Sequence, residues 1–287
     1  MLGGTGQVGF ELVRYLAPSA TVVAPSRAEL DLTDLAAVAR TIAAHHPSLI
    51  YNAAAFTQVD VAEREPVEAY RLNAELPGAI GEAAAQADAA VVHFSSDYVF
   101  NGMSDVPYVE TDDAVPLNVY GVTKLAGEEA LRASGAASLV FRTSWVYGSR
   151  GSNFALTVRD RLAKGQVLRV VDDQHGAPTW SRAIARTSIQ CAEQLGRDLD
   201  RWRTEGGVYH VSSAGETTWY GFAAALADIF QPHDGRSAIH PVTSSEYRSA
   251  ARRPRNSLLN SERVSRVFGV RLPEWREQLG QVFGKNA

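Results

Sequence analysis

The sequence predicts an α/β fold in which a parallel, doubly wound sheet is covered by helices on both faces. Over residues 1–145, short apolar segments alternate with longer helical patterns, which is typical of repeated strand–helix–strand units. These apolar segments are hydrophobic throughout, as expected for strands buried on both faces. A glycine-rich sequence precedes the first helical pattern, which is the arrangement expected at the first turn of such a fold.

The elements follow in order along the chain. The helical patterns fall at 8–17, 33–46, 60–87, 120–134, 154–164, 183–195 and 219–230. The strand patterns fall at 21–24, 48–52, 90–94, 138–142, 167–171 and 208–212. Asp31 and Thr33 are candidate caps for the second helix, and Pro77 is expected to mark a boundary or a first turn within 60–87.

Composition excludes several classes of protein. The chain has 287 residues, of which 45% are hydrophobic and 21% charged, so one or two globular domains are expected. A net charge of -4 without basic runs removes the electrostatic reason to bind nucleic acid or a membrane surface. The single cysteine, Cys191, cannot form an internal disulfide, which favours a reducing cytoplasm. We expect Cys191 to pack in the core.

The sequence GGTGQVG at 3–9 is the first candidate site. Glycines allow the backbone to approach a pyrophosphate closely at a helix N-terminus, where free N–H groups face the anion. Taken alone, the same sequence is compatible with an ordinary tight turn.

Tyr120 and Lys124 form a second candidate site on a predicted helix. A spacing of four places both side chains on one face. The lysine cation would lower the pKa of the tyrosine from about 10 towards neutrality, and such a tyrosine can donate a proton to a carbonyl oxygen. A surface Tyr–Lys pair is the alternative interpretation.

The sequence HFSSDYVF at 93–100 is the third candidate site, because it follows the strand predicted at 90–94. Ligands of doubly wound sheets bind at the carboxyl ends of the strands. The hydroxyl of Ser96 could therefore hold a substrate carbonyl beside Tyr120. A turn that closes the strand is the alternative.

In this order, the glycine loop, Ser96, Tyr120 and Lys124 resemble the extended short-chain dehydrogenase/reductase superfamily, which has a Rossmann-like fold. From Gly3 to about Leu279 the sequence resembles the dTDP-4-dehydrorhamnose reductase family. The resemblance depends on the segments GGTGQVGFEL, NAAAFTQVDVAEREP, HFSSDYVFNG, PLNVYGVTKLAGEEA, FRTSWVYG, DDQHGAPT, TTWYGFA and ARRPRNSLLN. It implies NAD(P)H-dependent reduction of the C4 ketone of dTDP-4-dehydro-β-L-rhamnose to dTDP-L-rhamnose, for bacterial surface polysaccharides.

The resemblance also implies roles for individual residues. Tyr120 would be the general acid, Lys124 would bind the nicotinamide ribose, and Ser96 stands where the family usually has threonine. The implied cofactor-binding residues are Gly3, Gly6, Gln7, Val8, Asp31, Leu32, Ala53, Ala54, Ala55, Tyr120 and Lys124. The implied substrate-binding residues are Ser96, Asp97, Tyr98, Trp145, Arg253 and Asn256, and Trp219 would pack under the substrate region.

Two regions are expected, because the regular alternation of strands and helices ends after Trp145. Residues 1–145, with segments of about 167–212, would form the dinucleotide-binding domain. Residues of about 146–166 and 213–287 would form a smaller substrate-binding region.

Arg27 bears on the choice of cofactor. Folds specific for NAD usually place an acid at the end of the second strand, whereas the sequence here is APSR at 24–27. Arg27 could meet a 2′-phosphate, so we expect NADPH, with NADH as an alternative. A solvated loop arginine is the other interpretation of this residue.

No catalytic metal is expected, because none of the seven histidines has metal-ligand spacing with other candidate ligands. Some members of the family carry Mg²⁺ at a dimer interface, and Glu11 matches one acid near that site. The resemblance therefore also suggests a homodimer.

The family begins with a buried strand of about five apolar residues, whereas only Met1 and Leu2 precede the glycine loop here. In the usual strand order the missing strand lies inside the sheet, so two neighbouring strands would lose hydrogen-bonding partners. We expect a start codon upstream; a truncated product is the alternative.

Two other functions stay open at this point. One is a nucleotide-sugar epimerase or dehydratase with tightly held NAD, and the other is a non-catalytic NADP-binding regulatory subunit. The motifs also leave open whether the product is rhamnose or a close deoxysugar.

Overall fold

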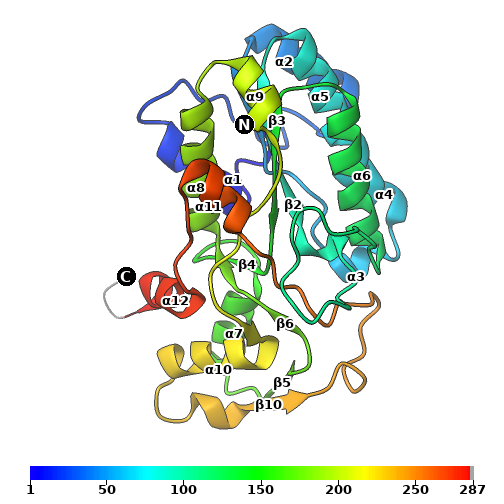
Figure 1. Cartoon of the computed structure of the whole chain (residues 1–287). Coiled ribbons are helices and arrows are strands. Elements are labelled where there is room, and N and C mark those ends of the chain that lie inside the picture. Colours follow the sequence, from blue (N-terminus) through cyan, green and yellow to red (C-terminus); the bar gives the residue numbers. More distant parts are fainter. Residues whose placement is uncertain (285–287) are drawn as a thin grey trace.

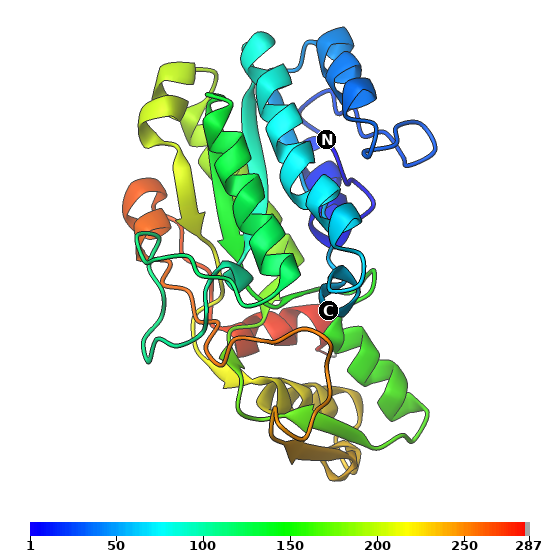
Figure 2. The same ribbon diagram turned by 90° about the vertical axis from the view of Figure 1, so that its right-hand side faces the viewer.

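The computed structural model describes residues 1–284 as two lobes, a larger one built on a parallel sheet and a smaller one beneath it (Figure 1). The N-terminus lies in the larger lobe and the C-terminal helix lies in the smaller one (Figures 1 and 2). Within 1–284, no helix is both long and apolar enough to cross a membrane.

The sheet of the larger lobe has four parallel strands in the order β1-β2-β3-β8. They are β1 (Leu49–Asn52), β2 (Ala90–Ser96), β3 (Ser138–Thr143) and β8 (Gly207–His210). The strands predicted at 48–52, 90–94, 138–142 and 208–212 are thereby confirmed, as is the parallel α/β fold.

Helices cover both faces of this sheet (Figure 1). On one face, α2 (Leu35–His45), α5 (Leu76–Gln86) and α6 (Val119–Ala133) pack against a core that includes Val91 and Val140. On the other face, α1 (Gln7–Leu16), α8 (Ser181–Leu195), α9 (Leu199–Glu205) and α11 (Glu262–Phe268) pack against a core that includes Val92 and Leu139. Successive residues of one strand thus enter opposite cores, which explains the continuous apolar patterns. Cys191 lies in the second core, as expected.

Side-chain caps fix the starts of two helices that bear on the site. Asp34 caps α2 by accepting a hydrogen bond from the Ala37 amide. The predicted caps Asp31 and Thr33 are wrong, because the Asp31 carboxylate accepts from Thr33 in the preceding turn. Asn118 caps α6 by accepting from the amide of Gly121 at 2.8 Å.

The segment predicted as helical at 60–87 consists of several pieces. They are α3 (Val59–Ala62), α4 (Pro66–Tyr70), the π-helical η1 (Arg71–Glu75) and α5. Pro77 lies in the first turn of α5, as expected. Asn73 in η1 binds both backbone groups of Phe56 and donates to Thr123 of α6.

The smaller lobe combines distant parts of the chain. Its parallel pair is β5 (Leu168–Val171) and β10 (Ile239–Val242). Its helices are α7 (Phe154–Ala163), α10 (Trp219–Phe230) and α12 (Trp275–Phe283). Its remaining short elements are β4 (Val146–Tyr147), β6 (His175–Gly176), β7 (Thr179–Trp180), β9 (Thr217–Thr218) and η3 (Gly235–Ala238). In the larger lobe, the short helix η2 (Asp97–Val99) follows β2 directly.

The expected boundary between the two regions differs from the structure at two places. The strand predicted at 167–171 exists, but it belongs to the smaller lobe, because it pairs with β10 and not with the four-stranded sheet. Conversely, α11 returns to the larger lobe, where Val264 and Phe268 join the core beneath the sheet.

The strand predicted at 21–24 is wrong: these residues are described throughout and form no strand. The Met1 amino group donates to the Val23 carbonyl at 2.8 Å, and Leu2 forms an isolated bridge with Asn52. Leu2 thus makes one isolated bridge on the β1 side, and residues 21–24 pair with no strand.

Candidate active site

The three proposed catalytic residues meet at the carboxyl edge of the sheet. Ser96 ends β2, while Tyr120 and Lys124 lie on successive turns at the start of α6. Lys124 is 1% exposed and Ser96 is 6% exposed, whereas Tyr120 is half-buried. A ligand can therefore approach the phenol while the lysine stays inside.

Asp97 is the buried acid of this site. Its carboxylate accepts hydrogen bonds from Ser96 Oγ at 2.8 Å and from Ser144 Oγ at 3.2 Å. Burial raises the pKa of Asp97 to about 6, although these hydroxyls oppose the rise. The Ser96 hydroxyl is therefore held by Asp97 beside the tyrosine.

The predicted effect of Lys124 on Tyr120 is wrong. Burial raises the pKa of Tyr120 to about 12, with the hydroxyl of Ser96 acting in the opposite direction. The Lys124 amine instead donates to the Phe94 carbonyl at 2.7 Å and lies 3.3 Å from His93 Nε2. Tyr120 therefore keeps its proton at neutral pH, which suits a proton donor.

Beneath these residues lies a buried ion pair between α6 and β3. Arg142 Nη2 lies 2.7 Å from Glu128 Oε2, and both side chains are about 95% buried. Ser95 Oγ also donates to Glu128. Because Ser95 adjoins Ser96 and Glu128 follows Lys124 by one turn, this pair fixes the helix against the sheet.

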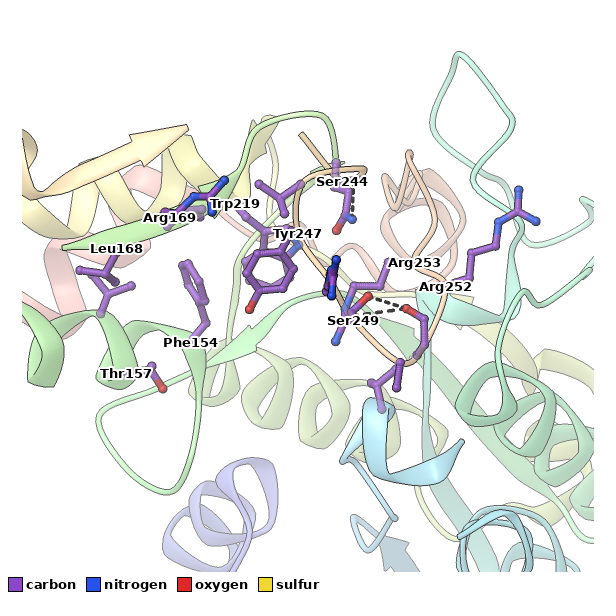
Figure 3. Close-up of a pocket in the computed structure, with 18 of the residues that line it drawn as sticks. Phe154, Thr157, Leu168, Arg169, Trp219, Ser244, Tyr247, Ser249, Arg252 and Arg253 are labelled. Atoms are coloured by element: carbon purple, nitrogen blue, oxygen red, sulfur yellow. Dashed lines mark hydrogen bonds between the residues drawn. The ribbon is translucent and has the colours of Figure 1, made fainter. Parts of the chain in front are cut away.

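A cavity of about 1110 Å³ lies beside the site, between the lobes (Figure 3). Figure 3 shows Phe154, Trp219 and Tyr247 facing this space from the smaller lobe. None of the described residues that line the cavity is acidic. The lining includes five arginines, Arg161, Arg169, Arg248, Arg252 and Arg253.

Tyr98 connects the cavity with the catalytic candidates. It lines the cavity, and its ring meets that of Tyr120 edge-on with centroids 5.8 Å apart. Arg253, which also lines the cavity, pairs with Asp60 of α3 at 2.6 Å. This ion pair ties the segment 244–253 of the smaller lobe to the larger lobe. Of the predicted substrate-binding residues, Tyr98 and Arg253 thus reach the cavity wall.

Trp145 lies one layer behind the cavity. Its ring stacks on that of Trp219 at a centroid distance of 3.6 Å. A Cβ on Gly176 would lie 2.4 Å from the Trp145 ring, so only glycine fits there. The backbone of Trp145 is left-handed, with φ of 47°. Trp145 therefore supports Trp219, which forms part of the wall.

Asn256 is not brought to the cavity, because it lies outside the described residues that line it. Its amide donates to the Ser104 and Val106 carbonyls, and its carbonyl oxygen accepts from the Leu258 amide. The side chain thus secures the loop at 104–106.

The predicted pyrophosphate loop packs against the alanine segment. Gly3 has φ of 74°, and a Cβ there would lie 2.5 Å from the amide nitrogen of Ala54. Close contact thus joins Gly3, Ala53 and Ala54, with Gly6 and Gln7 at the start of α1. Gln7 Oε1 accepts from Asn153 of the loop before α7 at 2.9 Å. The predicted set is completed by Val8 in the first turn of α1 and Ala55 after Ala54.

The residues predicted for the adenine side lie on the loop between residues 21–24 and α2. Arg27 is exposed and Leu32 is half-buried. Hydrogen bonds from Thr33 lower the pKa of Asp31, and Arg27 contributes in the same direction. Arg27 and Asp31 are thus near neighbours.

The suggested Mg²⁺ site has no support in the structure. Glu11 is 4% exposed, and its carboxylate already accepts from Arg182 at 3.0 Å. Within residues 1–284, no three His, Cys, Asp or Glu side chains gather to hold a metal ion.

The sequence interpretation missed four of the cavity arginines. Arg248 and Arg252 precede Arg253 in one basic segment. This clustering in the sequence could have indicated a binding site for an anion. Arg161 and Arg169 come from α7 and β5, and only the tertiary fold brings them to the same cavity.

A family model described as "RmlD substrate binding domain" matches residues 1–287. The chain belongs to this family. A dTDP-4-dehydrorhamnose reductase of Burkholderia thailandensis is 40% identical over 283 residues, covering 97% of this chain and 95% of that protein. One from Escherichia coli K12 is 41% identical, covering 96% and 93%. The Bacillus anthracis dTDP-4-dehydrorhamnose reductase in complex with NADP superposes with a TM-score of 0.89 at 30% identity, covering 98% and 96%. The glycine loop and the Ser96–Tyr120–Lys124 set thus belong to an RmlD substrate binding domain protein.

Proposed function

We propose that the chain reduces the C4 ketone of dTDP-4-dehydro-β-L-rhamnose to dTDP-L-rhamnose with a nicotinamide cofactor. The main support is the protonated Tyr120 beside Ser96, which Tyr98 connects to an arginine-lined cavity. Relatives named dTDP-4-dehydrorhamnose reductase, which match nearly the whole chain, support the same substrate.

The loop at 3–9 and the residues around Ala53–Ala55 fit a dinucleotide. Close backbone approach at Gly3 leaves no room for a side chain, and the N-terminus of the ten-residue helix α1 presents free N–H groups to a pyrophosphate. A bound nicotinamide supplies the hydride. We assign the cofactor to the larger lobe and the sugar nucleotide to the cavity between the lobes.

Tyr120 donates its phenolic proton to O4 of the sugar as the ketone gains a hydride at C4, which gives the secondary alcohol and a phenolate. The Ser96 hydroxyl donates to Asp97 in this structure, and it can donate to the same sugar oxygen when its proton turns from Asp97 to the substrate. The phenolate of Tyr120 takes up a proton before the next turnover. The protein's contribution is therefore orientation and the proton.

The arginines of the cavity support an anionic substrate. With five guanidinium groups and no carboxylate among the described lining residues, the cavity suits the diphosphate of a nucleotide sugar. The aromatic wall of Phe154 and Trp219 is available to a base or a sugar ring.

The test is consumption of NADPH with dTDP-4-dehydro-β-L-rhamnose generated in the assay from dTDP-glucose. Tyr120→Phe is expected to lower kcat by about 10²–10⁴-fold, because general-acid catalysis is lost. Tyr70→Phe, at an exposed tyrosine, is the matched control and should keep full activity. An unchanged rate in Tyr120→Phe would refute the assignment, and purification with tightly bound NAD would favour an epimerase or dehydratase.

NADPH preference is a finer proposal that depends on the exposed Arg27. Arg27→Ala is expected to lower the ratio of kcat/KM for NADPH over NADH by roughly tenfold, as for one lost charge-assisted contact. An unchanged ratio would show that Arg27 does not determine the preference for NADPH. Arg40→Ala, at another exposed arginine, is the control. The homodimer and the cytoplasmic location stay predictions.

A further inference from the structure

The loop at 148–153, between β4 and α7, joins the smaller lobe to the first turns of α1. Asn153 Nδ2 donates to Gln7 Oε1 at 2.9 Å, although the two residues are 146 positions apart in the sequence. The Arg150 guanidinium lies over the ring of Phe10, 3.4 Å from its centroid. The 148–153 loop is thus seated on the helix that begins at the proposed dinucleotide loop.

Hydrogen bonds on both sides of the Asn153 amide group fix its orientation. Its Oδ1 accepts from the backbone amide of Leu156 at 3.0 Å, which caps α7. Its Nδ2 donates to the carbonyls of Gly148 and Arg150, each at 3.1 Å. A backbone N–H can only donate and a carbonyl can only accept. The NH₂ group of Asn153 therefore faces Gln7.

This orientation determines how the side chain of Gln7 lies. An amide nitrogen cannot accept a hydrogen bond, so Gln7 must present its oxygen to Asn153 and turn its NH₂ group away. Among the described residues, that NH₂ group meets no acceptor. Gly6, the N-cap of α1, has no side chain to occupy the first N–H groups of the helix. The start of α1 therefore holds unoccupied donors on its backbone and on Gln7.

On its other side, Asn153 begins the helix that forms one wall of the cavity between the lobes. Four residues of α7 line this cavity: Phe154, Thr157, Val158 and Arg161. Thr157 Oγ1 also donates to the Asn153 carbonyl at 3.0 Å. Asn153 therefore contacts the proposed dinucleotide loop through Gln7 and the cavity through α7.

We propose that Asn153 is a positioning residue that couples binding of the dinucleotide to binding of the sugar nucleotide. It holds Gln7 with the NH₂ group available to the pyrophosphate, and a pyrophosphate bound by Gln7 in turn fixes Asn153 and the start of α7. The second ligand then meets a cavity wall that is already ordered, so the coupling is positive and reciprocal. The identity of the two ligands rests on the proposed function, but the contact between the lobes does not.

Isothermal titration calorimetry on the intact chain tests the coupling without an activity readout. Saturating NADP⁺ is expected to lower the Kd for dTDP by about fivefold. In Asn153→Ser, which keeps a capping oxygen for α7 but is too short to reach Gln7, this factor should fall to about one. Asp198→Ser, a comparable change at the N-cap of α9, is the matched control and should keep the wild-type factor. An equal factor in wild type and Asn153→Ser, or no coupling in wild type, overturns the proposal.

A double-mutant cycle shows whether Asn153 acts through Gln7. Gln7→Met is expected to raise the Kd for NADP⁺ about tenfold, because a donor to the charged pyrophosphate is lost. Asn153→Ser should raise it by somewhat less, because Gln7 is still present but no longer oriented. The double variant should bind NADP⁺ no more weakly than Gln7→Met alone. A merely structural role of the α7 cap would make the two effects additive, which would overturn the proposal.

Failure of this inference and failure of the proposed function give different results. If the wild-type chain binds no NADP⁺, the proposed cofactor site fails and the coupling fails with it. If NADP⁺ binds with the same Kd in wild type and Asn153→Ser, while Tyr120→Phe still loses reduction of the ketone, the coupling alone is refuted.

Discussion

Around Asp97 and Lys124, ionisable groups lie inside the larger lobe and their proton affinities are shifted, to pKa values of about 6 and about 8. In the cavity between the lobes, Arg252 is exposed and Arg253 forms an ion pair with Asp60. The first region controls where protons reside, and the second offers fixed positive charge to a ligand. The difference follows from the partners of each group: desolvation dominates at Asp97 and Lys124, whereas the hydrogen bond with Asp60 raises the pKa of Arg253 although the side chain is partly buried.

The comparison predicts its largest effect at the buried pair of Glu128 and Arg142. Arg142→Met should lower the free energy of unfolding by about 3–5 kcal/mol, because Glu128 would be left as an unpaired buried charge. Denaturant unfolding followed by circular dichroism measures this. Arg203→Met, which breaks the exposed pair with Asp200, should change stability by less than about 1 kcal/mol. Equal effects in the two variants would contradict the comparison.

The buried Asp97 is expected to have a smaller effect on the free energy of unfolding, and this effect depends on pH. Because burial raises its pKa in the folded protein from 3.8 to about 6, the folded state binds more protons than the unfolded state between pH 4 and 6. Its contribution to the free energy of unfolding therefore falls as pH rises through this window, by roughly 3 kcal/mol at most. The stability of Asp97→Asn relative to wild type should rise from pH 4 to 7. Asp105→Asn, at an exposed position, should give a flat difference; a flat difference for Asp97→Asn would count against the shift.

The smallest predicted effect concerns the cavity. Arg253→Gln should raise KM for the dTDP-sugar about tenfold with little change in kcat, because it removes ground-state binding to an anion. Arg255→Gln, two residues away and exposed outside the cavity lining, is the matched control. Steady-state kinetics at two salt concentrations would show the difference, since the contribution of Arg253 should shrink as salt rises. A loss confined to kcat would place Arg253 among the catalytic groups.

Most strands of the larger lobe could be predicted because the residue pattern that determines each of them lies within one short segment of the sequence. Strands such as 90–94 have an unbroken apolar pattern, and β1 and β2 are each followed along the chain by a helix that covers the sheet, α5 and α6. The conjunction of Ser96, Tyr120 and Lys124 was predictable for the same reason, since the end of a strand and the start of a helix meet at one edge of the sheet.

The predictions from sequence that proved wrong have different physical causes. Asp31 and Asp34 have the same capping chemistry, and only the geometry shows that Asp34 caps α2 while Asp31 closes a turn. The spacing of Tyr120 and Lys124 gives a shared helix face, but the long lysine side chain extends to β2 and not to the phenol. Residues 21–24 have strand propensity, yet a strand also needs a neighbour with enough residues to pair.

The pairing of β5 with β10 has a consequence for biosynthesis of the chain. The partner of Leu168 is Ile239, about 70 residues later. At translation rates of about 5–20 residues per second, residues 168–171 wait roughly 4–14 s for that partner to emerge. During this interval the apolar segment is open to pairing with other chains, because an unpaired strand edge is a template for association. Folding of the smaller lobe therefore has to follow synthesis of most of the polypeptide, while much of the larger lobe is already available.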